Sequence, residues 1–183
     1  MRAEIAARDV RLLIMDVDGV LTDGGIFYDH EGRIMKRFHV RDGLGIKMAQ
    51  QVGLDLAVIT GLDQPCVRAR VTELGITEYF AGKKDKIPVF EELLARKGLT
   101  PDQAAFLGDD WLDAGIMSRA GLAMAVADAA PEVVGLAHWV STLPGGCGAV
   151  RQAIDFILRA QGKLDALWAS RVGGSKAGGG SGA

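Results

Sequence analysis

The sequence has little cysteine and no excess of positive charge. Its two cysteines, Cys66 and Cys147, form no CxxC pair, so neither a disulfide framework nor a zinc or redox motif is expected. The 21 lysines and arginines stand against 23 aspartates and glutamates, which gives a formal net charge of -2 at pH 7. A chain without a basic surface does not attract a nucleic-acid backbone or an anionic membrane. We therefore expect no nucleic acid and no membrane among its partners.

Long apolar runs are absent as well. No run approaches the roughly 18 residues that a membrane-spanning helix needs, and the first residues, MRAEIAARDV, lack the apolar stretch of a secretory signal. The predicted location is the cytoplasm. With 49% hydrophobic residues the chain can bury one core, so we predict a single domain over residues 1–172. Residues 173–183 read GGSKAGGGSGA and are predicted to form a flexible glycine-rich tail.

Short apolar runs alternate with amphipathic segments along the chain. The runs read VRLLIM, LDLAVI, AAFL, LAMAVA and HWV, and helical patterns cover residues 43–53, 64–74, 85–97, 110–120 and 149–167. Such alternation is typical of βαβ units. The sequence therefore predicts an α/β fold, a Rossmann-like parallel sheet flanked by helices. Thr100 and Pro101 predict a further short helix just before Ala104.

The pattern changes over residues 25–38. Here GIFY and RIMKRF flank the turn sequence DHEG, which is typical of a β-hairpin. An isolated hairpin with apolar residues on both faces is marginally stable and needs a cover. We predict a protruding hairpin that a second subunit covers.

Two acidic segments follow predicted strands. Asp16 and Asp18 come directly after VRLLIM, and Asp109 and Asp110 follow AAFL and one glycine. Because open α/β sheets bind ligands at the carboxyl ends of their strands, these side chains should share one edge. Clustered carboxylates repel one another unless a cation lies among them, and Mg²⁺ prefers such oxygen ligands. The alternatives are a solvated turn after the first strand and helix capping after the second, and Asp113 fits the capping alternative.

Two further polar features fit a phosphate-binding edge. Thr60 and Gly61 end the run LDLAVI and offer a hydroxyl and accessible backbone amides to a phosphoryl oxygen. Lys86 opens a predicted helix and can neutralise a phosphate. Each feature alone is weak evidence, since lysines are usually solvated. Their order with the acidic segments is the stronger observation.

That order, strand-DxD, strand-TG, lysine at a helix start and strand-GDDxxD, resembles the phosphatases of the haloacid dehalogenase superfamily over about residues 10–168. Within the superfamily, the chain resembles the family of 3-deoxy-D-manno-octulosonate 8-phosphate phosphatases in the segments DVDGVLTDG, FHVRDGLGIK, RARVTELGI, GDDWLDAGIM, AVADA and GGCGAVRQAIDFILRAQGKLD. The resemblance implies a Mg²⁺-dependent phosphomonoesterase that acts through an aspartyl phosphate on a small phosphorylated sugar acid. Its product would feed lipopolysaccharide synthesis.

The resemblance also implies roles for single residues. Asp16 is the implied nucleophile, Asp18 the general acid and base, and Thr60 and Lys86 hold the phosphoryl group. The implied metal ligands are Asp16, Asp18 and Asp109, with Asp110 supporting the metal shell. The implied substrate-binding residues are Asp18, His39, Val40, Arg41, Asp42, Gly43, Lys47, Gly61, Arg70 and Lys86.

Two positions depart from the family pattern. Leu62 and Cys147 stand where the family commonly has arginine, and each change removes a guanidinium suited to carboxylates and phosphates. A phosphatase for a nine-carbon sugar-acid phosphate therefore remains an alternative, as does a non-catalytic oligomerising homologue. The intervals between the motifs leave no room for a cap domain, and the resemblance implies a homotetramer assembled through the hairpin.

Overall fold

The computed structural model describes residues 2–173. Its central sheet has six parallel strands in the order β5-β4-β1-β6-β7-β8. These strands are β1 (Leu12–Met15), β4 (Asp55–Ile59), β5 (Glu78–Phe80), β6 (Ala104–Gly108), β7 (Leu122–Ala125) and β8 (Trp139–Val140). The chain leaves β1 toward β4 on one side and reaches β6 on the other, so the strand order reverses at β1. Open α/β sheets bind their ligands at such a position.

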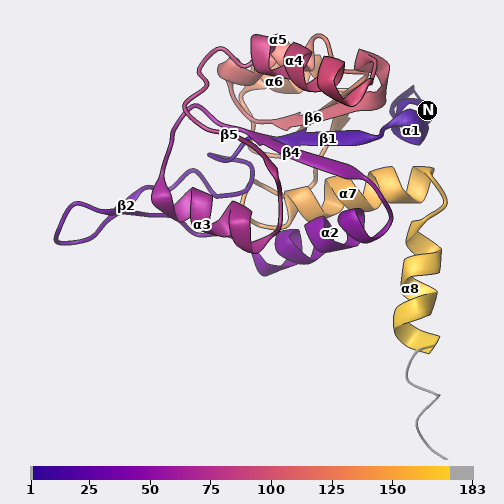
Figure 1. The fold of residues 1–183 in the computed structure, drawn as a ribbon, viewed down its shortest axis with the longest axis horizontal. Coiled ribbons are helices and arrows are strands. Elements are labelled where there is room, and N and C mark those ends of the chain that lie inside the picture. Colours follow the sequence, from indigo (N-terminus) through magenta and orange to yellow (C-terminus); the bar gives the residue numbers. More distant parts are fainter. Residues whose placement is uncertain (1, 174–183) are drawn as a thin grey trace, which may run out of the picture.

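Helices cover both faces of the sheet (Figure 1). One face carries α4 (Ile87–Lys97), α5 (Ala114–Met117) and α6 (Pro131–Leu136), and the other carries α1 (Arg2–Asp9), α2 (Val40–Gln51), α3 (Pro65–Glu73) and α7 (Ala149–Ala160). Alternate residues of each strand enter the two cores: Leu13 and Met15 of β1 pack toward α2 and α7, while Leu12 and Ile14 pack toward α4. Burial on both faces explains why these strands read as continuous apolar runs. The predicted fold class is confirmed.

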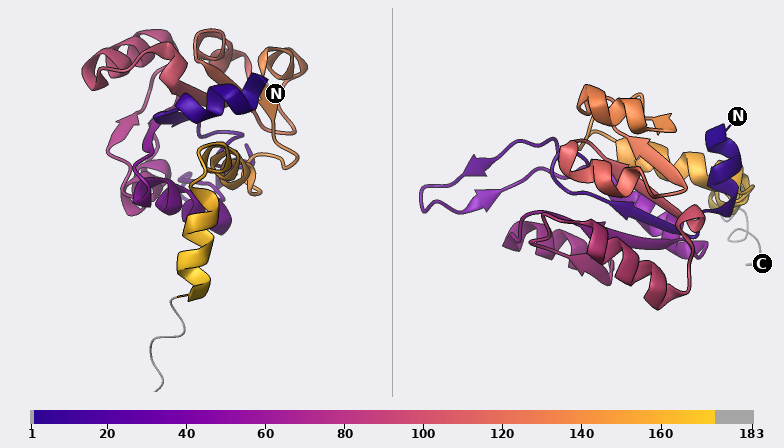
Figure 2. Two further views of the ribbon diagram at one scale, coloured as in Figure 1. Left: turned by 90° about the vertical axis from the view of Figure 1, so that its right-hand side faces the viewer. Right: turned by 90° about the horizontal axis from the view of Figure 1, so that it is seen from above.

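The hairpin leaves the body of the molecule as a separate arm (Figures 1 and 2). It consists of β2 (Phe27–Tyr28) and β3 (Ile34–Met35), paired antiparallel. In the turn, the carboxylate of Asp29 accepts the backbone N–H groups of Glu31 and Arg33, each at 2.9 Å. Four apolar side chains on the arm are exposed: Ile26, Phe27, Tyr28 and Met35 are each more than half accessible to solvent.

Two predicted helices differ from the structure. The sequence predicts one helix over residues 149–167, but the structure has two in this region, α7 and α8 (Leu164–Gly173). Gly162 adopts a left-handed conformation with φ of +67°, which ends the first helix, and α8 points away from the body (Figure 1). The segment 110–120 is a 3₁₀ turn, η2 (Trp111–Asp113), followed by the short α5. The short helix predicted before Ala104 is present as η1 (Pro101–Gln103).

The expected glycine-rich tail lies outside the described residues, except that Gly173 ends α8. None of the helices within residues 2–173 has the length and hydropathy of a membrane span.

Candidate active site

The floor of the candidate site is formed where β1 and β6 end. Asp16 directly follows β1, and its backbone N–H donates to the carbonyl of Leu107 at 3.1 Å, which continues the pairing of the two strands. Asp109 directly follows β6. Because the two strands are neighbours and parallel, their carboxyl ends present the two side chains at one place. Only 7% of Asp16 is exposed.

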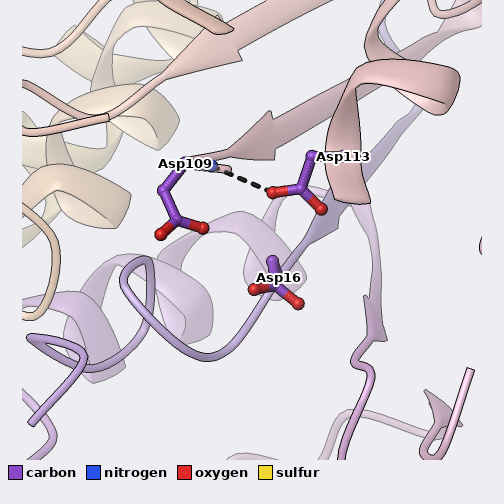
Figure 3. A group of neighbouring side chains, drawn as sticks. All are labelled: Asp16, Asp109 and Asp113. Carbon is purple, nitrogen blue, oxygen red and sulfur yellow. Dashed lines mark hydrogen bonds between the residues drawn. The ribbon is translucent and has the colours of Figure 1, made fainter. Parts of the chain in front are cut away.

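A third aspartate completes an acidic cluster at this floor. Asp16, Asp109 and Asp113 each offer a carboxylate oxygen, and these oxygens lie within 4.8 Å of one another (Figure 3). Asp113 ends η2 and is buried, and its Oδ2 accepts the backbone N–H of Asp109 at 2.9 Å. The tight turn requires Gly108, since a Cβ there would lie 2.5 Å from Asp113 Oδ2.

Lys86 is the cation of this cluster. It immediately precedes α4 and is 3% exposed, and its Nζ donates to Asp16 Oδ1 and Asp113 Oδ1, each at 2.6 Å. Three ionised carboxylates and one ammonium leave a formal charge of -2 in a largely buried place. Such an arrangement costs free energy unless protons or a cation offset it.

The pKa values reflect this unbalanced charge. Burial, followed by the charge of Asp113, raises the pKa of Asp16 to about 6, although Lys86 acts in the opposite direction. Burial, followed by the charge of Asp16, raises the pKa of Asp109 to about 8. Burial alone would lower the pKa of Lys86, but Asp16 and Asp113 outweigh it, so that pKa is raised and the lysine stays charged. A site that raises the pKa of two carboxyl groups while offering clustered oxygens fits a hard divalent cation.

A cavity of about 310 Å³ opens above the cluster. Thr60 follows β4 at its edge, is 1% exposed, and its Oγ1 accepts the backbone N–H of Leu62 at 3.5 Å. The cavity is lined by Asp16, Asp18, Thr60, Gly61, Leu62, Lys84, Lys86, Asp109, Asp110, Leu112 and Asp113. All four predicted catalytic residues and all four predicted metal ligands therefore line one cavity.

Asp18 and Asp110 line the cavity but stand apart from the three clustered aspartates. Asp18 forms an ion pair with Lys36 of the hairpin arm. Asp110 is exposed, and its Oδ1 accepts the backbone N–H of Trp111 at 2.7 Å, so it caps η2. The metal-binding roles of both residues stay predictions.

Seven predicted substrate residues do not line this cavity: His39, Val40, Arg41, Asp42, Gly43, Lys47 and Arg70. The first five lie at the start of α2, which is at the carboxyl edge of the sheet because α2 runs back antiparallel to the strands. Val40 is 83% exposed. The remaining side chains make contacts elsewhere, since Lys47 Nζ donates to the carbonyl of Leu74 at 2.7 Å and Arg70 pairs with Glu73 at 2.9 Å. Their substrate role stays a prediction.

Asp113 is the functional candidate that sequence reasoning undervalued. Its position in the first turn of a predicted helix suggested capping alone. The structure shows it buried, and it holds both Lys86 and the backbone of Asp109. The available signal was its place four residues after Asp109 in GDDWLD.

Known proteins resemble this chain in sequence and in structure. Residues 45–154 match the model of the haloacid dehalogenase-like hydrolases. The chain is 44% identical over 159 residues to the 3-deoxy-D-manno-octulosonate 8-phosphate phosphatase of Escherichia coli strain K12, covering 87% of this chain and 85% of that protein.

Two solved structures extend the likeness to three dimensions. The phosphatase of the same name from Yersinia pestis is 44% identical with a TM-score of 0.87, covering 89% of this chain and 88% of that one. The one from Moraxella catarrhalis, in complex with a magnesium ion, a phosphate ion and KDO, is 36% identical with a TM-score of 0.90, covering 92% and 97%.

Proposed function

We propose, from the premise that this chain belongs to the haloacid dehalogenase-like hydrolase family, that it hydrolyses 3-deoxy-D-manno-octulosonate 8-phosphate to 3-deoxy-D-manno-octulosonate and phosphate. The observation that carries the chemistry is the buried set of three aspartates around Lys86 at the floor of the cavity. An idle cavity gains nothing from such unfavourable charge. The choice of substrate rests on the similarity to the phosphatases named above.

Magnesium is the proposed cofactor, and the residues present fit it. Asp16 and Asp109 supply carboxylate oxygens within 4.8 Å of one another, and Asp18 and Asp110 are the further proposed ligands at the wall of the same cavity. When bound, Mg²⁺ would keep the carboxylates of Asp16 and Asp109 ionised and would offset negative charge on the phosphoryl oxygens. The Moraxella catarrhalis structure holds both magnesium and phosphate.

Asp16 is the proposed nucleophile. Its carboxylate attacks phosphorus in line, an Asp16–phosphorus bond forms, and the bond from phosphorus to the sugar oxygen breaks. Asp18 gives its proton to the departing sugar oxygen. It then takes a proton from the water that attacks the aspartyl phosphate, which releases phosphate and restores Asp16. One side chain thus serves both half-reactions.

The neighbouring residues hold the phosphoryl group and the reacting side chains. The Thr60 hydroxyl and the backbone around Gly61 line the cavity beside Asp16 and bind phosphoryl oxygens. Lys86 offsets charge that develops in the transition state. Asp113 positions Lys86 and the backbone of Asp109 through the hydrogen bonds described above.

Assembly and cellular role form a further part of the proposal. The exposed apolar side chains of the hairpin support a homotetramer assembled through that arm. A neighbouring subunit then closes the cavity, and residues at the start of α2 form part of the substrate-binding surface. The enzyme acts in the cytoplasm, and its product feeds lipopolysaccharide synthesis.

A second candidate substrate, a nine-carbon sugar-acid phosphate, is favoured by one observation. Leu62 lines the cavity and Cys147 accepts from the Arg37 guanidinium at 3.7 Å, where the family pattern commonly has arginine. A substrate whose carboxylate is placed differently suits a protein without those two arginines.

Phosphate release from a panel of sugar phosphates tests the proposal. We expect Mg²⁺-dependent release, fastest from 3-deoxy-D-manno-octulosonate 8-phosphate, and a loss of at least about a thousandfold in Asp16→Asn, with deamidation excluded by mass spectrometry. Asp165→Asn, an exposed substitution on α8, is the control. Faster release from a nine-carbon substrate would change the proposed substrate and would leave the proposed mechanism intact. No release from any compound would favour the non-catalytic homologue.

A further inference from the structure

Lys36 is an exception on the hairpin arm. Phe27, Tyr28 and Met35 of β2 and β3 are exposed, but the side chain of Lys36, the next residue after β3, is 0% exposed. Its ammonium forms an ion pair with Oδ1 of Asp18, which lines the active-site cavity. A buried ammonium is costly without a partner, so this contact fixes where the arm meets the body.

The returning strand of the hairpin is fastened to the loop after β1 at three successive residues. Lys36 pairs with Asp18, Arg37 Nε donates to Asp23 Oδ2 at 2.9 Å, and Phe38 forms a β-bridge with Thr22. The Arg37 pair is exposed, with 59% of the arginine side chain accessible. The exposed pair and the bridge already tie the arm to the loop, so a tether alone does not require a buried lysine on Asp18.

We propose that Lys36 is a positioning residue for Asp18, and the inference rests on the proposed phosphatase function. By engaging Oδ1, the ammonium restricts rotation of the carboxyl group and leaves Oδ2 for proton transfer to the departing sugar oxygen. A carboxyl group without this contact samples several rotamers, and few of them place an oxygen at the leaving group. Through Lys36 the hairpin therefore takes part in the reaction as well as in assembly.

A positioning role makes a distinctive prediction about leaving groups. A sugar alkoxide is a poor leaving group and needs a proton from Asp18 as the bond breaks, whereas p-nitrophenolate leaves without one. Loss of Lys36 should therefore slow hydrolysis of the sugar phosphate much more than hydrolysis of p-nitrophenyl phosphate. A purely structural loss slows both alike.

The experiment compares kcat/KM for the two compounds in the Mg²⁺-loaded full chain. This parameter reports only the steps through formation of the aspartyl phosphate, so the later role of Asp18 toward water does not enter. We expect Lys36→Met to lower the ratio of sugar-phosphate to aryl-phosphate kcat/KM by about tenfold or more, in the same direction as Asp18→Asn. Because both rates come from one sample, the ratio does not depend on the fraction of folded protein.

Lys97→Met is the matched control. Lys97 is also ion-paired, to Asp55 at 2.8 Å, but it lies at the opposite edge of the sheet, where β4 begins and α4 ends. In Lys97→Met, the ratio of sugar-phosphate to aryl-phosphate kcat/KM should stay within about twofold of wild type. An unchanged ratio in Lys36→Met, with active wild-type enzyme, would overturn the inference and leave the proposed function intact. A wild-type protein inactive on both compounds would overturn both.

Discussion

The acidic cluster should make the stability of the metal-free protein fall as the pH rises. Unfolded aspartate loses its proton near pH 3.8, whereas Asp109 in the fold has a pKa of about 8 and Asp16 one of about 6. Between these values the folded state binds more protons than the unfolded state, so raising the pH removes stability. The stabilisation is fully present below about pH 4 and is lost as the pH rises through 6 and 8.

The magnitude follows from the size of the shift. For Asp109 alone, one pKa unit corresponds to about 1.4 kcal/mol, which gives at most about 4 kcal/mol between pH 5 and pH 8. Asp109 is only half-buried, and solvent screening reduces this to about 2 kcal/mol. Saturating Mg²⁺ binds the ionised carboxylates of the folded state, so it should stabilise the protein at pH 8 and flatten the pH dependence; a hundredfold excess over Kd adds about 2.7 kcal/mol.

Urea unfolding followed by circular dichroism, with EDTA or with Mg²⁺, measures this directly. In EDTA, Asp109→Asn should remove much of the slope because the amide does not titrate. Asp110→Asn, a matched change at the exposed neighbour, should keep the slope. The reasoning would be refuted by a wild-type protein whose stability in EDTA is flat or rises from pH 5 to pH 8. An unaltered slope in Asp109→Asn would refute the assignment to that residue.

Three further substitutions test other parts of the site. Lys86→Met leaves the buried Asp16 without its ammonium and should cost about 3 to 5 kcal/mol of unfolding free energy at pH 7, measured by urea unfolding, together with most phosphatase activity. Gly145→Ala puts a Cβ 1.6 Å from the carbonyl oxygen of Gly19, in the loop that carries Asp18, so kcat should fall and unfolding free energy should drop by about 1 to 3 kcal/mol. Phe27→Asp places a charge on the exposed hairpin and should give smaller species by size-exclusion chromatography with light scattering, with reduced activity.

Each of these changes has a matched control in the chain. Lys97→Met removes a partly exposed ion pair, so its cost should be below about 1 kcal/mol; an equal cost would contradict the buried-pair argument. Gly135→Ala meets no atom within 4 Å, and a loss as large as that of Gly145→Ala would discredit the clash. Ile5→Asp changes an exposed residue of α1 and should leave assembly unchanged. A fully active monomeric Phe27→Asp would contradict assembly through the hairpin.

The layered fold was predictable because its strands are buried on both faces. Runs such as VRLLIM and AAFL are apolar at almost every position, so they lack the apolar–polar alternation of a strand that is buried on one face only. The helical segments between them indicate a parallel arrangement. The break after α7 was not predictable in the same way. Gly162 lies within a pattern that stays helical on both sides, and a single glycine in a helical pattern is often tolerated. Its left-handed conformation and the direction of α8 are decided by tertiary context.

The site was predictable to the extent that its residues directly follow strands. Asp16, Thr60 and Asp109 each follow a strand, so sheet topology alone brings them to one edge. Asp113 follows no strand, and its burial depends on how η2 turns back onto Lys86. Lys36 follows a strand of the hairpin, not of the central sheet, and its contact with Asp18 depends on the angle at which the hairpin leaves the body. The contact of Lys36 leaves no pattern in the sequence, and that of Asp113 leaves only its spacing from Asp109 in GDDWLD.

The distribution of charge explains how the fold tolerates this site. The unfavourable carboxylates are confined to the carboxyl edge, while the interior of the sheet below them is wholly apolar on both faces. Residues such as Ile14, Phe106 and Leu107 are fully buried directly beneath the acids, so the hydrophobic contribution of the sheet offsets the cost of the cluster. A mutation that neutralises the cluster should therefore stabilise the metal-free protein while it abolishes catalysis, and Asp109→Asn is expected to do both.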